Sequence, residues 1–408
     1  MSAIIRPRRM LELNRRELLG GAAAIAGPFL LAGRAQAADT IKIAAVVPLA
    51  GAFAVSGKDI LNGARLAVSE INAAGGIKPI GGRHLEISEG DAGQSPETAV
   101  TTARRLLAGG PVASIGSWYS SLSLAATQVA EQRKVPWLTG SIADAIVNRG
   151  FKYVFQTSDG SQDSAQGLID AIVAIIGQRK PRLAVLADNN TANVDVIASF
   201  KKKVSVPFVS QQSWTPPLSD ATPAVTAMMQ SKPNVIYLGA TSTSDQVLLL
   251  KQLAAQGNTA PIIMGASSAC NPAFLEAVGS KGVEGLVVVT GIPFPGKGSD
   301  ALVSKYVAAY KEPFMDCEAL TGYVNIQIIA LGLEKAGKAD PIALRDAIAG
   351  LDAVDVPTLA MLPGGKRIQF QPNGRRKGVL VEFVQWQGGK PYVVHPPELA
   401  TAELKREI

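Results

Sequence analysis

The sequence predicts an α/β protein built from two doubly wound parallel-sheet lobes. Short runs rich in Val and Ile alternate with amphipathic segments from Ile41 onward. This alternation occurs twice, over residues 41–156 and 183–290, and two sheets of ordinary size are more common than one very large sheet. The runs are apolar on both faces, which is typical of central parallel strands that helices cover on both sides.

The composition agrees with such a fold and excludes several others. The chain has 408 residues, of which 47% are hydrophobic and 18% charged, so collagen, disulfide scaffolds and disordered chains are excluded. Of the net charge of +7, residues 1–37 carry +4 and the remaining 371 residues only +3, so no nucleic-acid partner is indicated. Two basic runs, Lys201–Lys203 and Arg375–Lys377, are interpreted as solvated faces or turns, with a partner surface as the alternative.

Residues 1–37 are predicted to be an export signal peptide. Arg15 and Arg16 precede a weakly apolar stretch at residues 18–33, and Ala35-Gln36-Ala37 forms a small-x-small processing site. Paired arginines before a Gly-rich core resemble a twin-arginine export signal with cleavage after Ala37, and the sequence leaves the choice between the twin-arginine and Sec routes open. A membrane span needs about 20 strongly apolar residues, so an uncleaved anchor is the lesser alternative. We expect the mature protein in the periplasm.

The expected elements follow one another along the chain. In the first repeat, strands are expected over residues 41–47, 85–88, 112–115, 135–138 and 153–156; in the second, over 183–186, 208–211, 235–238, 262–264 and 286–289. Helices are expected over 60–74 and 96–108, because Ser95-Pro96 is an N-cap signal and Gly pairs follow both segments. Further helices are expected over 299–311 and 316–336, and strands near 367–370, 379–386 and 392–394 then complete one lobe.

The loops after these strands indicate a binding site. In open α/β sheets, ligands bind beyond the carboxyl ends of the strands. Those loops are rich in Gly, Ser, Thr and Asn and nearly lack Lys, Arg, His and paired carboxylates, at residues 116–121, 139–144, 188–191, 239–244 and 265–269. Several helix N-termini facing one crevice would suit a small anion or carboxylate. For each loop alone, the ordinary preference of βα loops for Gly and of N-caps for Ser or Thr is the alternative.

The sequence contains no motif for catalysis, a cofactor or a metal. It has no G-x-S-x-G elbow and no phosphate-binding loop, and its two histidines, His84 and His395, stand apart from any Ser/Asp set. With two cysteines and no Cys/His cluster, a zinc site is not expected. Cys270 and Cys317 allow one disulfide in an oxidising compartment, and the sequence leaves their pairing open. We therefore expect a protein that is not an enzyme and has no cofactor.

Short segments spread over more than 300 residues carry a family resemblance. In chain order they are Ile43–Gly51, Asn62–Ala64, Glu70–Ile77, Gly116–Ser121, Val135–Trp137, Arg149–Phe155, Gly322–Tyr323 and Val384–Trp386. In order and spacing the chain resembles the type I periplasmic solute-binding proteins of the branched-chain amino-acid (leucine/isoleucine/valine) class, which serve ABC transporters. The resemblance covers nearly all of the mature chain.

The resemblance implies two lobes joined by three hinge strands, with crossings near residues 156–159, 290–293 and 359–363. Lobe 1 would comprise residues 38–157 and 292–359, and lobe 2 residues 158–291 and 360–408. It also implies that the protein, as a monomer, closes on a small carboxylate-bearing solute and presents the closed form to a membrane ABC permease. The solute would be a branched-chain or other amino acid, or an aromatic or branched organic acid.

The resemblance also implies a set of ligand contacts. They are Ser120, Ser121, Ser141 and the Ala143 N–H for the carboxylate, then Asn193, Thr241 and Ser267 from lobe 2, and Glu318 at a position that often faces the ligand. Where amino-acid binders place an acid for the ammonium, this chain has Ser267 or Ser268. An uncompensated ammonium in a closed cleft costs several kcal/mol. Leucine is therefore expected only if Glu318 or Asp144 supplies the charge, and an acid without the amine is the other possibility.

Two other functions stay open at this point. A ligand-sensing regulatory subunit of the same fold would capture a solute in the same cleft, although the export signal argues against a cytoplasmic sensor. A serine hydrolase would use Ser120 or Ser121 as its nucleophile, but the sequence shows no base near either residue.

Overall fold

The computed structural model describes residues 40–359, 362 and 365–405. The expected export signal and its processing site after Ala37 lie outside the described residues. Among the helices of the described part, none combines the length and the hydrophobicity that crossing a membrane requires.

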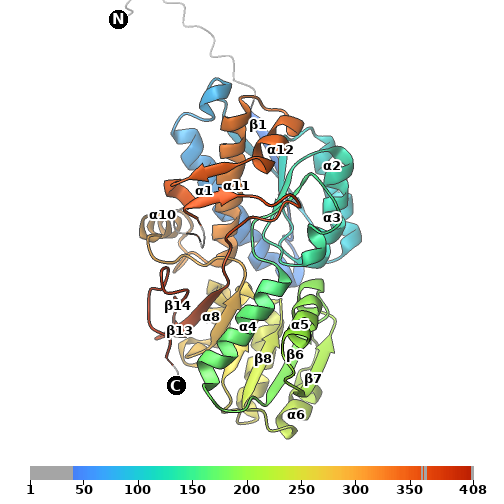
Figure 1. Cartoon of the computed structure of the whole chain (residues 1–408), viewed down its shortest axis with the longest axis vertical. Coiled ribbons are helices and arrows are strands. Elements are labelled where there is room, and N and C mark those ends of the chain that lie inside the picture. Colours follow the sequence, from blue (N-terminus) through green and yellow to red (C-terminus); the bar gives the residue numbers. More distant parts are fainter. Residues whose placement is uncertain (1–39, 360–361, 363–364, 406–408) are drawn as a thin grey trace, which may run out of the picture. The chain divides into compact units, whose positions relative to one another are not determined.

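The first sheet, whose strand β1 is labelled in Figure 1, has five parallel strands in the order β2-β1-β3-β4-β5. Its strands are β1 Ile41–Val47, β2 Leu85–Asp91, β3 Ala113–Gly116, β4 Trp137–Thr139 and β5 Val154–Gln156. The associated helices are α1 Ala54–Ala73, α2 Pro96–Ala108, α3 Ser120–Arg133, α10 Asp300–Tyr310, α11 Cys317–Ala336 and α12 Pro341–Ala349. Short 3-10 turns η1 Gly51–Phe53, η2 Lys78–Ile80 and η3 Asp144–Ile146 lie in its loops.

The second sheet has seven strands in the order β14-β13-β10-β9-β8-β6-β7. Its strands are β6 Leu183–Asp188, β7 Phe208–Trp214, β8 Val235–Gly239, β9 Ile262–Met264, β10 Val287–Thr290, β13 Glu382–Gln387 and β14 Lys390–His395. Strands β6 to β10 are parallel, whereas β13 and β14 join antiparallel, so the C-terminal tail completes this sheet. The helices are α4 Ser161–Ile176, α5 Thr191–Lys203, α6 Thr222–Gln230, α7 Thr243–Ala255, α8 Pro272–Val278 and α9 Ser280–Val283, with η4 Ser267–Cys270 after β9.

Helices α1 and α11 pack backbone to backbone at two glycines. A methyl group at Gly63 would lie 1.7 Å from the carbonyl oxygen of Ala319, and one at Gly322 would lie 2.0 Å from that of Ile60. Because neither position has room for a side chain, the helices approach closely, and α11 is buried along most of its length. This contact fixes the start of α11, which carries Glu318.

The segment around Arg375 differs from the sequence interpretation. Arg376 is only 1% exposed, its backbone N–H donates to the carbonyl of Gln156 at 2.8 Å, and its Nε donates to the carbonyl of Thr157 at 3.1 Å. The solvated-turn interpretation of Arg375 and Arg376 is therefore wrong, because the carbonyls at the end of β5 supply buried acceptors. Only Lys377 of this run is exposed, whereas Lys201–Lys203 are exposed at the end of α5, as expected.

Residues 352–376 also lie beside the first sheet. Strands β11 Asp352–Val354 and β12 Arg367–Gln369 form a small antiparallel sheet, and Phe370 packs against Phe155 of β5 with ring centroids 5.3 Å apart. The chain therefore stays beside the first sheet through Arg376 and joins the second sheet at β13. The segment after the crossing expected near residues 359–363 thus still contacts β5 at Phe370 and Arg376.

Candidate functional site

A cavity lies where the carboxyl ends of both sheets' strands meet. It contains about 460 Å³ of space free of protein atoms, open solvent included. In each sheet the strand order reverses direction, between β1 and β3 and between β6 and β8, and such reversals open a crevice for ligands. The lining residues are Trp118, Tyr119, Ser120, Ile142, Ser164, Asn190, Ala192, Asn193, Thr241, Gly265, Ala266, Ser267, Val289, Thr290, Gly291 and Ile292. None of these described residues carries a charged side chain.

The structure brings half of the sequence-predicted contacts to this cavity. Ser120, Asn193, Thr241 and Ser267 line it. The other four predicted contacts are not among the residues that line it, and each bonds to a neighbour described below: Ser121, Ser141, Ala143 and Glu318.

Ser141 supports Trp118 from behind the cavity wall. Its hydroxyl donates to the Trp118 carbonyl oxygen at 2.6 Å and lies 2.6 Å from the Ser123 hydroxyl. Trp118 has φ of 57°, a left-handed conformation that is unfavourable for a bulky residue and persists only where surrounding contacts hold it. Ser141 therefore helps to hold the backbone of a residue whose side chain lines the cavity, and it is only 1% exposed itself.

Ser120 and the loop 141–143 form one hydrogen-bonded unit. The Ala143 N–H donates to the Ser120 hydroxyl oxygen at 3.3 Å, so the amide predicted to meet a carboxylate contacts Ser120 instead. Gln156 pins the loop by donating from Nε2 to the Ser141 carbonyl at 2.6 Å. Ser120 is the first residue of α3, and the amides of a first helical turn lack intrahelical acceptors and favour negative charge. This wall therefore offers neutral donors.

Aromatic rings form the remainder of the first wall. Phe53 stacks on Tyr119 with centroids 4.2 Å apart and meets Trp118 edge to face at 6.4 Å. Burial, with the nearby Asp188 and Asp245 carboxylates, raises the pKa of the Tyr119 phenol above its ordinary value. Tyr119 therefore stays protonated at neutral pH, and the aromatic surface carries no charge.

Asp188 organises the second wall. This carboxylate ends β6, is 1% exposed, and accepts from the Thr241 N–H at 2.7 Å, the Asn193 Nδ2 at 2.7 Å and the Asn190 N–H at 3.0 Å. Burial raises the pKa of Asp188, while these bonds oppose the rise. One buried acid thus positions three residues that line the cavity.

Two further lining hydroxyls on this side also contact buried acids. The Ser267 hydroxyl donates to Glu318 Oε1 at 2.5 Å, and the Ser164 hydroxyl donates to Asp159 Oδ2 at 2.9 Å. Burial, together with Asp316, raises the pKa of Glu318 to about 8, and burial also raises the pKa of Asp159. Both acids are therefore harder to ionise than ordinary carboxyl groups, and only the uncharged Ser267 and Ser164 line the cavity here.

Two sets of hydrogen bonds join elements of the first and second sheets beside the cavity. The Ser121 hydroxyl of α3 donates to Asn190 Oδ1 at 3.1 Å and lies 3.2 Å from the Thr191 hydroxyl at the start of α5. The Ser267–Glu318 bond connects η4 to α11 in the same way. Ser121 and Glu318 therefore connect the two sides of the cavity in this structure.

Sequence reasoning missed three residues that organise the site. Asp188 was noted only as part of a loop, Gln156 was treated as the end of a strand, and Arg375 was assigned to a turn. A signal was available for Asp188 alone, since an acid that ends an apolar strand before Asn-Asn-Thr needs nearby donors. The other two depend on partners far away in the sequence.

Comparisons with known proteins agree with this geometry. A family model described as "Periplasmic binding protein" matches residues 40–390. A Leu/Ile/Val-binding protein homolog 7 from Brucella suis biovar 1 (strain 1330) is 28% identical over 393 residues, covering 92% of this chain and 96% of that protein.

Two solved structures share the fold at low identity. A branched-chain amino acid transporter substrate binding protein from Streptococcus pneumoniae, in complex with isoleucine, has a TM-score of 0.75 at 20% identity, covering 88% of this chain and 100% of that chain. A solute binding protein from R. palustris, in complex with benzoate, has a TM-score of 0.73 at 20% identity, covering 87% and 95%. These likenesses confirm the predicted fold class.

Proposed function

Because this chain belongs to the periplasmic binding protein family, we propose that it is the substrate-binding component of an ABC importer and captures a small carboxylate-bearing solute. Members of this family are binding proteins rather than enzymes, which agrees with the absence of catalytic motifs in the sequence. The solute would bind in the cavity between the two sheets, held by Ser120, Asn193, Thr241 and Ser267.

The observation that carries this proposal is a cavity without charged lining residues beside the first turns of α3, α4 and α5. A hydrogen bond to a charged group contributes about 1.5–3 kcal/mol, and a helix N-terminus adds about 0.3–1 kcal/mol. Three or four such donors offset the lost hydration of one carboxylate and leave about 8 kcal/mol, which corresponds to micromolar affinity.

The same cavity favours an acid that lacks an ammonium group. Asp144 forms an ion pair with Arg375, and Glu318 is held behind the Ser267 hydroxyl with its pKa raised to about 8. Neither acid offers a free negative charge to the ligand. We infer that an aromatic or branched organic acid binds more tightly than the amino acid of the same shape, because a buried unpaired ammonium is costly.

Thermal shift with matched ligand pairs tests this proposal. The pairs are phenylalanine with 3-phenylpropanoate and leucine with 4-methylpentanoate, and benzoate is added as a flat acid. A bound ligand stabilises the folded protein by RT ln(1 + [L]/Kd), so we expect a concentration-dependent rise in Tm for the amine-free acids. No shift with any of these compounds would contradict capture of small carboxylates. A larger shift with the amino acids would contradict only the preference for amine-free acids.

Hinge closure is a general mode of movement in periplasmic binding proteins, and it requires two lobes. We propose that the first two crossings lie at residues 156–159 and 290–293, as the resemblance implies, and that the third lies between Lys377 and Glu382. Bonds connect these crossings: the Asp159 N–H donates to the Gly291 carbonyl at 3.1 Å, and the Phe294 N–H donates to Glu382 Oε2 at 2.6 Å.

Export, the permease partner and the monomeric state belong to the same proposal. Replacement of Arg15 and Arg16 by Lys is expected to abolish secretion if the twin-arginine route is used, which a fractionation assay measures.

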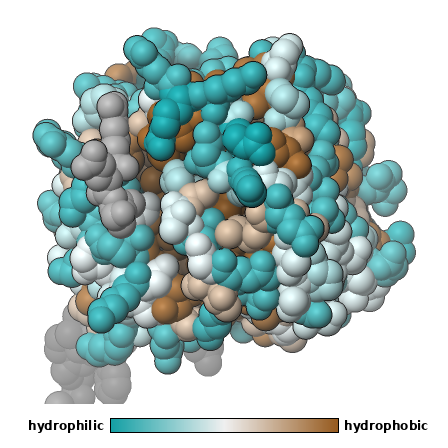
Figure 2. Space-filling view, turned by 90° about the horizontal axis from the view of Figure 1, so that it is seen from below, coloured by the Kyte–Doolittle hydropathy of each residue, from teal (hydrophilic) through white to brown (hydrophobic). Residues whose placement is uncertain are grey.

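The surface seen from below mixes hydrophilic residues with small hydrophobic areas (Figure 2), and the large hydrophobic residues exposed in the described chain are few: Val173, Val194, Ile342, Val354 and Leu380. Large exposed apolar patches mark stable interfaces, so this distribution supports a monomer.

No observation favours the two other functions. A serine hydrolase needs a base beside its nucleophile, but Ser120 accepts the Ala143 N–H, and neither described histidine, His84 or His395, lines the cavity. A regulatory subunit would capture the solute in the same way, and the predicted export signal supports the transport function instead.

A further inference from the structure

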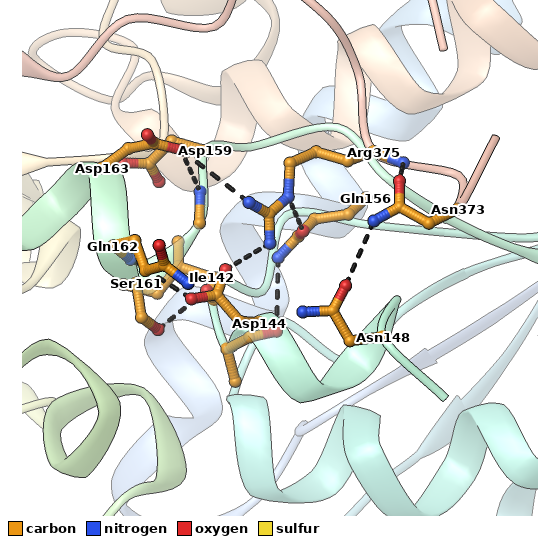
Figure 3. Close-up of polar contacts among 12 residues, drawn as sticks. Ile142, Asp144, Asn148, Gln156, Asp159, Ser161, Gln162, Asp163, Asn373 and Arg375 are labelled. Atoms are coloured by element: carbon orange, nitrogen blue, oxygen red, sulfur yellow. Dashed lines mark hydrogen bonds and ion pairs between the residues drawn. The ribbon is translucent and has the colours of Figure 1, made fainter. Parts of the chain in front are cut away.

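Arg375 is the centre of a polar cluster whose members are close in sequence to the lining residues Ile142 and Ser164. Figure 3 shows its guanidinium directed at side chains from three parts of the chain. Nε donates to Gln156 Oε1 at 2.9 Å, Nη2 forms an ion pair with Asp144, and Nη1 lies 3.9 Å from Asp163 Oδ2. Arg375 thus contacts an acid associated with the first sheet, an acid associated with the second sheet and the end of β5.

The two acids belong to segments that supply opposite walls of the cavity. Asp144 begins η3, directly after the loop that contains the lining residue Ile142. Asp163 lies in the first turn of α4 and precedes the lining residue Ser164. The Arg375 guanidinium therefore links the two segments.

Other hydrogen bonds dock the same two segments. The Gln162 N–H donates to Asp144 Oδ2 at 3.3 Å, and the Ser161 hydroxyl donates to the Ile142 carbonyl at 3.0 Å. Gly160 makes the approach possible, because a methyl group there would lie 2.3 Å from Asp144 Oδ1 and 2.4 Å from Arg375 Nη1. The first turn of α4 therefore lies against the loop after β4.

The two ion pairs differ in strength. The side chains of Arg375 and Asp144 are 15% and 14% exposed, so little water screens their interaction. Asp163 is 55% exposed and its contact is longer, which makes it the weaker pair and the one that salt screens. The contact between Arg375 and α4 is therefore the adjustable one, while Asp144 and Gln156 anchor the guanidinium.

We propose that Arg375 is a positioning residue for solute capture, which holds the start of α4 against the loop 141–144 and so sets the balance between open and closed lobes. Asp163 belongs to α4 beside the second sheet, whereas Arg375 is bonded to Gln156 of β5 in the first sheet, so rotation about the crossings changes the distance between them. The role rests on the proposed capture by hinge closure, but its test needs no ligand.

The test compares ligand-free variants by small-angle X-ray scattering and by hydrogen exchange of residues 157–164. Asp163→Asn removes the charge that faces Arg375 but keeps an oxygen that accepts the Gly160 N–H. We expect a larger radius of gyration and roughly twofold to fivefold faster exchange at residues 160–164, the range that corresponds to a weak ion pair. Asp170→Asn is the matched control, since it removes an exposed charge from the same helix, away from the cluster.

Substitutions of Arg375 complete the test. Arg375→Met is expected to open the lobes more than Asp163→Asn, and the double variant is expected to match Arg375→Met alone, because one pair cannot be lost twice. Arg375→Lys keeps the charge but loses the two-sided geometry, so an intermediate result is expected. The proposal would be overturned if, at low salt, Asp163→Asn and Asp170→Asn had the same radius of gyration and the same exchange rates at residues 160–164. This outcome is decisive whether or not any Arg375 variant folds.

Discussion

The two walls of the cavity present similar neutral groups but are supported in different ways. Behind the first wall lie hydroxyl and amide side chains, where Ser141 bonds to the Trp118 carbonyl and Gln156 bonds to the loop 141–143. Groups of the second wall bond to three buried acids, namely Asp188, Asp159 and Glu318, the last of which belongs to α11 beside the first sheet. Removal of one side chain from a neutral network costs the free energy of about one hydrogen bond. Removal of a buried acid costs more, because several buried donors then lack an acceptor, and a buried acid without its donors is likewise costly.

We therefore expect substitutions at the acids bonded to the second wall to change the free energy of unfolding and its pH dependence. Substitutions in the first wall are expected to have effects that are largely independent of pH. The acids also explain how hydroxyl and amide groups on the second wall are oriented without exposing charge to a ligand. The following substitutions separate the two walls.

The largest effect is expected for Asp188→Ala. Removal of this carboxylate leaves the Thr241 N–H, the Asn193 amide and the Asn190 N–H without their acceptor, so we expect a loss of about 3–5 kcal/mol in the free energy of unfolding. Urea denaturation followed by circular dichroism measures it. Asp188→Asn keeps one acceptor oxygen and is expected to lose less. Equal stability of Asp188→Ala and the wild type would show that the acid does not organise this wall.

The next effect concerns pH and Glu318. The pKa of Glu318 is raised to about 8 from an ordinary 4.5, so the folded state keeps a proton that the unfolded state releases above about pH 4.5. The wild type should therefore lose stability as pH rises from about 4.5 to about 8, by on the order of a few kcal/mol. Glu318→Gln removes this titration, so its Tm should exceed that of the wild type increasingly towards pH 8. Parallel Tm curves for the two proteins would contradict the assignment.

A smaller effect is expected on binding from the first wall. Ser120→Ala removes a hydroxyl that lines the cavity and should weaken binding of the acid that gives the largest thermal shift by roughly 1–3 kcal/mol. Isothermal titration calorimetry measures it, and fold stability should change little. Ser114→Ala is the matched control, because Ser114 is buried in β3 and does not line the cavity. Equal affinities for Ser120→Ala and this control would place the solute elsewhere.

The smallest effect is expected for Ser141→Ala. The Trp118 carbonyl loses one donor, while Ser123 and Thr139 can still bond to each other, so the loss of unfolding free energy should be about 1 kcal/mol. The fluorescence of Trp118 should shift, since its backbone is less firmly held. A loss of binding as large as that of Ser120→Ala would restore Ser141 to the set of direct contacts.

The sequence predicted the sheets well because their signal is local. The apolar runs near Ile41, Leu183 and Val235 each became a strand of the expected sheet, since short runs between turn signals leave few alternatives. The convergence of strand ends likewise predicted that Ser120, Asn193, Thr241 and Ser267 lie near one cavity. Their contacts with a ligand stay a prediction.

The rest of the site depends on contacts that no local pattern contains. Ser141 bonds to the carbonyl of Trp118, whose left-handed conformation could not be predicted from the residue types. Arg375 and Arg376 are held by Gln156 and Thr157, each 219 residues away in the sequence. A basic pair in a Gly-flanked turn is indistinguishable from a solvated one until its distant acceptors are known.

The glycine contact between α1 and α11 couples a position outside the cavity to the residues that line it. Gly63 touches no part of the cavity, yet its neighbour across the interface is Ala319, adjacent to Glu318. Any side chain added at Gly63 must push the start of α11 aside and with it the acid that orients Ser267. A single substitution at Gly63, outside the cavity, can therefore change ligand selectivity, both in evolution and in protein engineering.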